Sequence, residues 1–246
     1  MAKAWQDYYS NAAQPSMINW PKIEQFIGYG RLDAPAVFIG MEEGLADEAD
    51  LQSDLQLRST FDPVMDLEKA HEGIVNGASL FSDSPRRQPT WRVMADLMLH
   101  FEGRTFSSAE ERASARRTYR AKRLGRTDGG ALLAELLPYP HRNIGSWLYP
   151  ERFHDRETYV AKILPQRISL LDSVLVGSPR KAIICYGRGD WPKYKQLFAG
   201  VKWSTKDRFE CASWMNAKIT LTDHFVTQYF NTDNQLDELT AVALRQ

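Results

Sequence analysis

Two adjacent carboxylates, Glu42 and Glu43, directly follow a short apolar run and are well placed to do chemistry. The run covers residues 36–39, and Gly40 and Gly44 mark a turn around the two acids. Consecutive β-branched and aromatic residues are typical of a strand buried on both faces, as in a parallel sheet. Ligands of open α/β sheets collect outside the carboxyl ends of the strands. The position of Glu42 and Glu43 therefore favours a role in binding or proton transfer over a role in packing.

Three further apolar runs also end in turns or in side chains that could serve a site. They cover residues 131–137, 182–186 and 218–222. If these runs are strands joined by right-handed crossovers, all four carboxyl ends meet on one rim of the sheet. The side chains expected around one cleft on that rim are Glu42, Glu135, Tyr139, His141, Arg188 and His224.

Segments with helical spacing separate these runs. We predict helices over residues 91–101, 109–124, 156–176 and 235–244, with Thr90 as the N-cap of the first and Ser107 or Ser108 as the N-cap of the second. Residues 1–35 carry aromatic side chains among polar ones and predict a short helical lead-in. The alternation predicts a single α/β domain over residues 1–246, with three layers and helices on both faces of a mostly parallel four-stranded sheet.

The segment 107–126 is strongly basic. Arg112, Arg116, Arg120 and Arg123 fall near one face of the predicted helix. This is more positive charge than a favourable interaction with the helix dipole requires. Three interpretations stay open: a solvated surface helix, a strip that contacts the phosphates of DNA or a nucleotide, and a mobile arm.

Composition excludes several classes of protein. The formal net charge is zero, so only a local patch could attract nucleic acid or an acidic membrane. The two cysteines are too few for a disulfide framework or a cysteine-based metal site. No apolar run is long enough to span a membrane and no signal-peptide core begins the sequence, which predicts a soluble cytoplasmic protein without a membrane partner. Nothing in the sequence predicts an oligomeric state.

Motifs for common cofactors and hydrolases are missing. The histidines lack the spacing of metal ligands, so we expect no metal site. Gly187-Arg188-Gly189 could bind a phosphate, but Pro192 interrupts any dinucleotide fingerprint, so we expect no cofactor. The sequence also has no P-loop, no serine elbow and no His-Glu-x-x-His helix.

The motifs at the predicted strand ends resemble those of the uracil-DNA glycosylase superfamily over roughly residues 35 to 230. Gly40-Met41-Glu42-Glu43-Gly44 stands where that family carries Gly-x-Asn-Pro-Gly or Gly-x-Asp-Pro, and Asp223-His224-Phe225 stands where it carries His-Pro-Ser. Glu135-Leu136-Leu137-Pro138 occupies the place of an Asn that reads the base edge. The family fold is a four-stranded, mostly parallel sheet between helices.

The resemblance implies a DNA-repair hydrolase that flips a nucleotide out of the helix and cleaves its N-glycosidic bond. It implies that Glu42 orients or activates water and that His224 stabilises the departing base. Tyr139 would stack on the base. The remaining substrate contacts would come from Gly40, Met41, Glu43, Glu135 and Phe225.

Departures from the family motifs carry their own predictions. Glu43 takes the place of a proline beside Glu42, and two like charges so close should raise the pKa of one carboxyl. An ionised Glu135 only accepts hydrogen bonds, which suits an amino group better than a carbonyl of uracil. We therefore expect that uracil is not the preferred base. Phe225 in place of a proline removes a rigid turn after His224.

Other interpretations of the same residues stay open. Glu42 and Glu43 could be acids at a helix start, His224 could be a structural residue at a strand end, and Tyr139 could pack against a loop. The chain could then be a non-catalytic protein that binds nucleic acid or a small ligand at the same rim. A small-molecule enzyme with a Glu–His pair is a third possibility.

Overall fold

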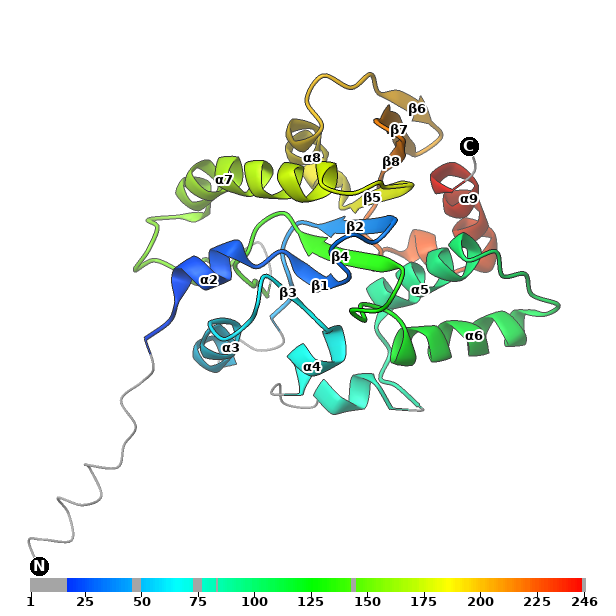
Figure 1. Cartoon of the computed structure of the whole chain (residues 1–246), viewed down its shortest axis with the longest axis horizontal. Coiled ribbons are helices and arrows are strands. Elements are labelled where there is room, and N and C mark those ends of the chain that lie inside the picture. The colour runs from blue at the N-terminus through cyan, green and yellow to red at the C-terminus, as the bar shows by residue number, and fades with distance from the viewer. Residues whose placement is uncertain (1–16, 46–49, 73–76, 83, 143–144, 245–246) are drawn as a thin grey trace, which may run out of the picture.

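A single sheet of eight strands runs through the computed structural model, which describes residues 17–45, 50–72, 77–82, 84–142 and 145–244 (Figure 1). The strand order is β3-β1-β4-β2-β5-β8-β7-β6. The strands are β1 (Gly28–Gly30), β2 (Ala36–Gly40), β3 (Val64–Met65), β4 (Ala131–Glu135), β5 (Ala182–Tyr186), β6 (Ser204–Lys206), β7 (Phe209–Trp214) and β8 (Ala217–Thr222).

The four strands expected from the apolar runs form the centre of this sheet. β4, β2, β5 and β8 are neighbours in that order, and each pairs with the next in parallel. β2 and β5 are buried along their whole length, which explains their continuous apolar sequences. The expected parallel α/β arrangement is therefore confirmed at the centre, and the carboxyl ends of the four strands share one rim.

The expected number of strands was wrong, because four more strands extend the sheet at its edges. β1 and β3 lie beyond β4, and β1 runs antiparallel to β4. On the other side β7 and β6 continue the sheet from β8 in antiparallel pairs. A tight turn joins β7 to β8 and places Met215 in the left-handed region at φ 51°. β1, β3 and β6 have only two or three residues each, and the six residues of β7 are interrupted by the polar Glu210 and Ser213, so none has the apolar run that identified the central four.

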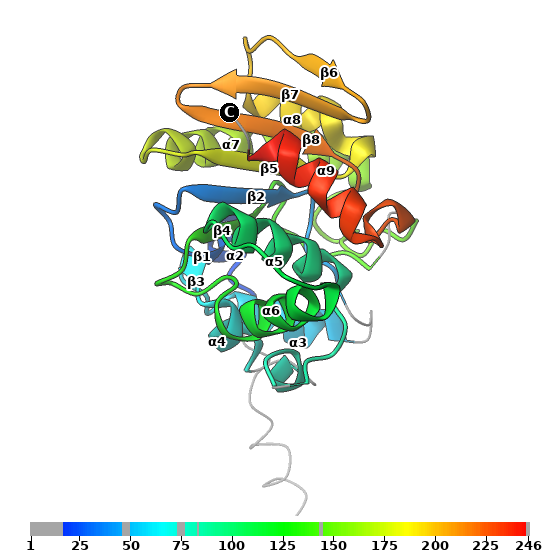
Figure 2. The same ribbon diagram turned by 90° about the vertical axis from the view of Figure 1, so that its right-hand side faces the viewer.

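Helices cover both faces of the sheet (Figures 1 and 2). α5 and α9 pack with Phe38 and Ile184 in one apolar core, and α7 and α8 pack with Val37 and Ile183 in the other. Alternate residues of β2 and β5 thus feed opposite cores, as the two-residue period of a strand requires. The helices are α2 (Trp20–Gln25), α3 (Leu51–Arg58), α4 (Leu67–His71), α5 (Pro89–Phe101), α6 (Ala109–Lys122), α7 (Arg156–Val176), α8 (Trp191–Leu197) and α9 (Asp233–Ala243), with 3-10 turns η2 (Gly77–Leu80), η3 (Arg188–Asp190) and η4 (Gln228–Phe230).

The four predicted helices are confirmed, with differences of one or two residues at the starts of α5 and α9 and at the ends of α6 and α9. The Ser108 hydroxyl accepts from the backbone N–H of Glu111 and caps α6, as expected. Thr90 is not the cap of α5, because Gln88 is its N-cap and Pro89 fills the first turn. The predicted helical lead-in is only partly helical within its described residues: α2 is followed by strand β1. Residues 1–16 of the lead-in lie outside the described residues.

Candidate active site

Strands β2 and β4 bring two of the predicted site segments side by side at the rim. Gly40 is the register partner of Glu135, and the N–H of Leu136 donates to the carbonyl of Gly40 at 2.8 Å. From the opposite side, the buried Arg167 of α7 donates to the carbonyl of Glu135 at 2.8 Å. These bonds fix the end of β4, and with it the carboxyl group of Glu135.

The carboxyl group of Glu135 lies in a tight, buried position. The Tyr186 hydroxyl donates to its Oε1 at 3.2 Å, whereas the buried Oε2 has no partner within the described residues. A methyl group at Gly40 would lie 2.2 Å from Oε2 and 2.4 Å from the Tyr186 hydroxyl, so only glycine fits there. Burial, together with the charges of Glu43 and Glu42, raises the pKa of Glu135 to about 8.

Glu135 therefore holds a proton at neutral pH, and one premise of the sequence analysis was wrong. The expected ionised Glu135 could only accept hydrogen bonds, whereas a protonated carboxyl both donates and accepts. A carbonyl or an amino group of a ligand could each find a partner there. The argument against uracil based on an ionised Glu135 no longer holds.

Glu42 lies on the turn after β2 and has one engaged and one free oxygen. Arg156, at the start of α7, contacts Oε2 at 2.6 Å. The buried Oε1 has no partner within the described residues. Burial raises the pKa of Glu42, although Arg156 opposes that shift. A carboxylate whose pKa is raised and whose second oxygen is free is suited to accept a proton from water.

Glu43 points away from Glu42 and is held in an ion-pair network. Its carboxylate accepts from the Tyr29 hydroxyl at 2.8 Å and from Arg58 at 2.6 Å, and Asp54 takes the other side of Arg58 at 2.5 Å. Burial would raise the pKa of Glu43, but Arg58 outweighs it and the pKa is lowered. The expected mutual effect of Glu42 and Glu43 is thus replaced by a joint effect of both on Glu135. The structure gives Glu43 a positioning role.

His224 follows β8 and lies exposed beside the same tyrosine. Its ring meets that of Tyr186 edge-on at a centroid distance of 5.5 Å. The backbone N–H of Val226 donates to Nδ1 at 3.3 Å, which places the proton of the neutral imidazole on Nε2. Partial desolvation of the ring, which packs against Tyr186, lowers the pKa of His224, although Asp190 opposes the shift. A neutral His224 thus offers an N–H donor without carrying a full charge.

Two residues predicted to contact substrate are instead part of the cores. Tyr139 is 0% exposed, and its ring packs among Trp20, Tyr149 and Tyr159, so it has no face free to stack on a base. The packing alternative for Tyr139 fits this position. Phe225 is also buried, and its ring stacks on that of Tyr186 at 4.6 Å. It supports the site from behind. Met41 is partly buried and packs against the core that includes α7.

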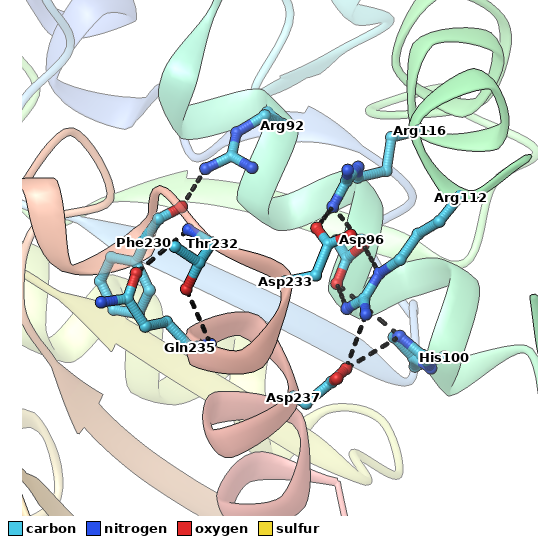
Figure 3. Close-up of polar contacts among 10 residues, drawn as sticks. All are labelled: Arg92, Asp96, His100, Arg112, Arg116, Phe230, Thr232, Asp233, Gln235 and Asp237. Atoms are coloured by element: carbon cyan, nitrogen blue, oxygen red, sulfur yellow. Dashed lines mark hydrogen bonds and ion pairs between the residues drawn. The ribbon is translucent and has the colours of Figure 1, made fainter. Parts of the chain in front are cut away.

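The basic strip on α6 is not a surface for phosphates. Arg112 binds both oxygens of the buried Asp96 on α5 at 2.8 and 2.6 Å, and Arg116 bridges Asp96 and Asp233 (Figure 3). Arg120 is buried and donates to the carbonyl of Pro85 at 2.9 Å. Of the four predicted arginines only Arg123 stays exposed. The expected phosphate strip and solvated helix are both corrected: this face of α6 binds α5 and α9.

Several residues of the site were missed by the sequence analysis. Tyr186 could have been found, because it is the last residue of a predicted strand that ends at the rim. Arg58 and Arg156 reach the acids from helices α3 and α7, and no motif marks them. The predicted rim residue His141 stacks on Trp147 and is buried. Arg188 pairs with Asp223.

One hollow of about 580 Å³ lies at the opposite ends of β5 and β8, and none of its lining residues, such as Lys181 and Lys218, carries a carboxyl group. Another of about 420 Å³ includes Glu102 and Glu111, which accept hydrogen bonds from Tyr119 and Ser107. At the rim, two carboxyl groups each keep an oxygen that has no partner within the described residues. We therefore place the candidate site at the rim.

Within the described residues, no group of three or more His, Cys, Asp or Glu side chains is arranged to hold a metal ion. No helix in the described part of the chain is long and apolar enough to cross a membrane. Comparisons with protein-family models, with curated proteins and with solved structures return no match to this chain.

Proposed function

We propose that this protein hydrolyses an N-glycosidic bond, releasing a base from a nucleotide or from DNA as a divergent relative of the uracil-DNA glycosylases. The observation that carries the proposal is the set of three carboxyl groups with different pKa values at the carboxyl ends of parallel strands. Burial raises the pKa of Glu135 to about 8. The pKa of Glu42 is raised less, and the pKa of Glu43 is lowered. Environments that separate pKa values in this way are typical of acid–base sites.

The reaction needs a water molecule, a cation-like sugar and a departing base. Glu42 accepts a proton as water attacks the anomeric carbon, and its charge favours the cationic sugar. The bond between that carbon and the base nitrogen breaks with its electron pair on the base. His224 donates a hydrogen bond from Nε2 to the base, and the protonated Glu135 binds the edge of the base. Tyr186 and Gly40 hold Glu135 in place.

The fold supports the same proposal. The parallel centre of the sheet lies between two layers of helices, and Glu42 and His224 follow its first and last strands in chain order. Arg112 and Arg116 pair with the buried Asp96, so they are not available to contact phosphates along a DNA duplex. A nucleotide or a short flipped-out segment therefore fits better than extended duplex binding.

The test is base release by purified protein from nucleosides, nucleotides and oligonucleotides that carry uracil, hypoxanthine, xanthine or alkylated bases. Glu42→Gln and His224→Ala should each lower the rate by about 10²–10⁴. Glu110→Gln, an exposed acid on α6, is the matched control and should leave the rate unchanged. No release from any substrate by the folded wild-type protein would overturn the enzymatic proposal.

The second candidate is a non-catalytic binding protein that uses the same rim. The unpartnered Oε1 of Glu42 and Oε2 of Glu135 favour it, because both could bind donor groups of a ligand without any reaction. Salt-sensitive DNA binding without base release would support this candidate. Release from nucleosides without any DNA binding would instead indicate a small-molecule enzyme.

A further inference from the structure

Two arginines converge on one carboxylate immediately before His224. Arg188, in the η3 turn after β5, contacts Oδ1 of Asp223 through Nε at 2.6 Å. Arg208, from the turn between β6 and β7, donates to Oδ2 through Nε at 2.8 Å and through Nη2. Arg188 also donates to the carbonyl of Arg208 at 2.8 Å. The two guanidinium groups are thus fixed relative to each other.

Aromatic rings add to this fixation. The guanidinium of Arg188 lies 4.7 Å from the ring centroid of Trp191, and that of Arg208 lies over the ring of Tyr229. The Trp191 ring is itself tied to the end of β8, because its Nε1 donates to the carbonyl of Thr222 at 3.1 Å. Stacked arginines of this kind lose little side-chain entropy when they bind a further partner.

Arg188 and Arg208 keep positive charge and hydrogen-bond donors for an anionic ligand. Two guanidinium groups face one carboxylate, so the cluster retains a net positive charge. Within the described residues the Nη1 group of Arg188 donates no hydrogen bond. The side chains are 51% and 35% exposed, so an anion from solvent can reach them. Planar N–H forks match the oxygens of a phosphate group.

We propose that Arg188 and Arg208 form a subsite for the phosphate group of a nucleotide, free or within a strand. This inference rests on the proposed base release, since it extends that site to the phosphate of the same substrate. Asp223, which holds both arginines, is the neighbour of His224 in the chain, so a phosphate on the pair lies close to a base at His224. Gly187 adopts φ 126° and lets the chain turn after β5 toward Asp223.

Calorimetric titration with inorganic phosphate, with a nucleoside 5′-monophosphate and with a single-stranded oligonucleotide tests this subsite. Arg188→Gln/Arg208→Gln should weaken binding of the preferred probe about tenfold or more, as loss of charge-assisted hydrogen bonds predicts. Arg117→Gln, an exposed arginine on α6, is the matched control and should bind as the wild type does. Preference for the monophosphate indicates a free nucleotide, and preference for the oligonucleotide indicates a strand.

The outcomes separate the subsite from the proposed reaction. Phosphate binding that the double variant loses, with no base release from any substrate, supports the subsite and overturns the reaction. Base release from nucleosides and nucleotides with equal KM, unchanged in the double variant, overturns the subsite and leaves the reaction. Removing both arginines leaves the buried Asp223 without its two partners, so far-UV circular dichroism checks that the double variant is folded. Arg188→Lys/Arg208→Lys keeps the charge and should bind better than the glutamine variant.

Discussion

Two charged clusters of this protein use the same residue types in opposite ways. Between α5, α6 and α9, Arg112 and Arg116 meet Asp96, Asp233 and Asp237, and the acids outnumber the arginines (Figure 3). We call this group the interhelical cluster. At the rim, Glu42 and Glu135 each keep an oxygen that has no partner within the described part of the chain, and Arg188 and Arg208 share one acid.

The difference indicates which cluster is structural and which can act on a ligand. In the interhelical cluster the charges hold helices together, since Asp96 is contacted by arginines from α6 and Asp233 and Asp237 belong to α9. Arg92 adds a further link by donating to the carbonyl of Phe230. A buried carboxyl oxygen without a partner lowers stability, and a ligand that binds it would remove that cost. Other buried polar atoms without a partner in the described residues include the hydroxyls of Thr220 and Thr240, whereas Glu42 and Glu135 place two carboxyl oxygens of this kind at one rim.

The largest effect is expected from Asp96→Asn. This change leaves two buried arginines without their shared acid, and breaking a buried pair costs about 3–5 kcal/mol. Urea denaturation measures the free energy of unfolding. Asp237→Asn is the matched control, because that side chain is 55% exposed and its loss should cost about 1 kcal/mol or less. An equal loss of unfolding free energy in both variants would show that the buried Asp96 contributes no more to stability than the exposed Asp237.

The second-largest effect on stability is expected from Gly40→Ala. The new methyl group would lie within 2.4 Å of two buried groups, Glu135 Oε2 and the Tyr186 hydroxyl, so one of them must move. We expect a loss of about 1–3 kcal/mol in the free energy of unfolding, as for other overpacked positions. Base release should fall far more than stability, because Glu135 is displaced. Gly44→Ala, where the methyl group meets open space, is the control. Full activity of Gly40→Ala would contradict this role of Glu135.

The pH dependence of stability tests whether Glu135 at the rim is protonated in the folded protein. The pKa of Glu135 is raised to about 8 in the folded chain, against roughly 4.3 when unfolded. Between these values the folded chain binds a proton that the unfolded chain has released, so stability should fall as pH rises from about 4 to about 8, by up to about 5 kcal/mol, and level off above that range. Glu135→Gln should remove this fall. Superimposable stability–pH curves for the variant and the wild type would rule out the raised pKa.

The smallest effect is expected from Arg123→Ala. Arg123 is the exposed member of the predicted basic strip and lies 3.7 Å from Glu102. A surface pair of this kind contributes about 0–1 kcal/mol. Neither the free energy of unfolding nor phosphate binding should change measurably, in contrast to Arg188→Gln/Arg208→Gln. Weaker phosphate binding by Arg123→Ala, measured by calorimetric titration, would show that the basic strip on α6 contributes to ligand binding after all.

Much of the central fold could be predicted from the sequence. The apolar runs at residues 36–39 and 182–186 are strands because both their faces are buried, which leaves an uninterrupted apolar signal. The long segment Arg156–Val176 was located with its bounds, and in the structure Asp155 caps it and Gly177 follows its last residue. The alternation in Phe209–Trp214 also signals a half-buried strand, and it was overlooked.

Other features had no local signal. The sequence of an arginine-rich helical face is the same whether the side chains contact water, phosphate or buried aspartates. Arg112 and Arg116 contact aspartates because α5 and α9 pack against α6. The opposite fates of Glu42 and Glu43 depend on Arg156 and Arg58, which lie on helices distant in the chain from each other. Such pairs form through long-range contacts that no motif of a few residues records.

The sequence by itself determined the parallel centre of the sheet and the presence of Glu42, Glu135 and His224 at the carboxyl ends of its strands. Periodicity and strand ends are local properties, and the connection rules carry them into space. Only the tertiary structure decided the protonation of Glu135, the free oxygen of Glu42 and the core position of Tyr139. Burial and charge pairing depend on every element packed around a residue, and the neighbours that set them are far apart in the chain.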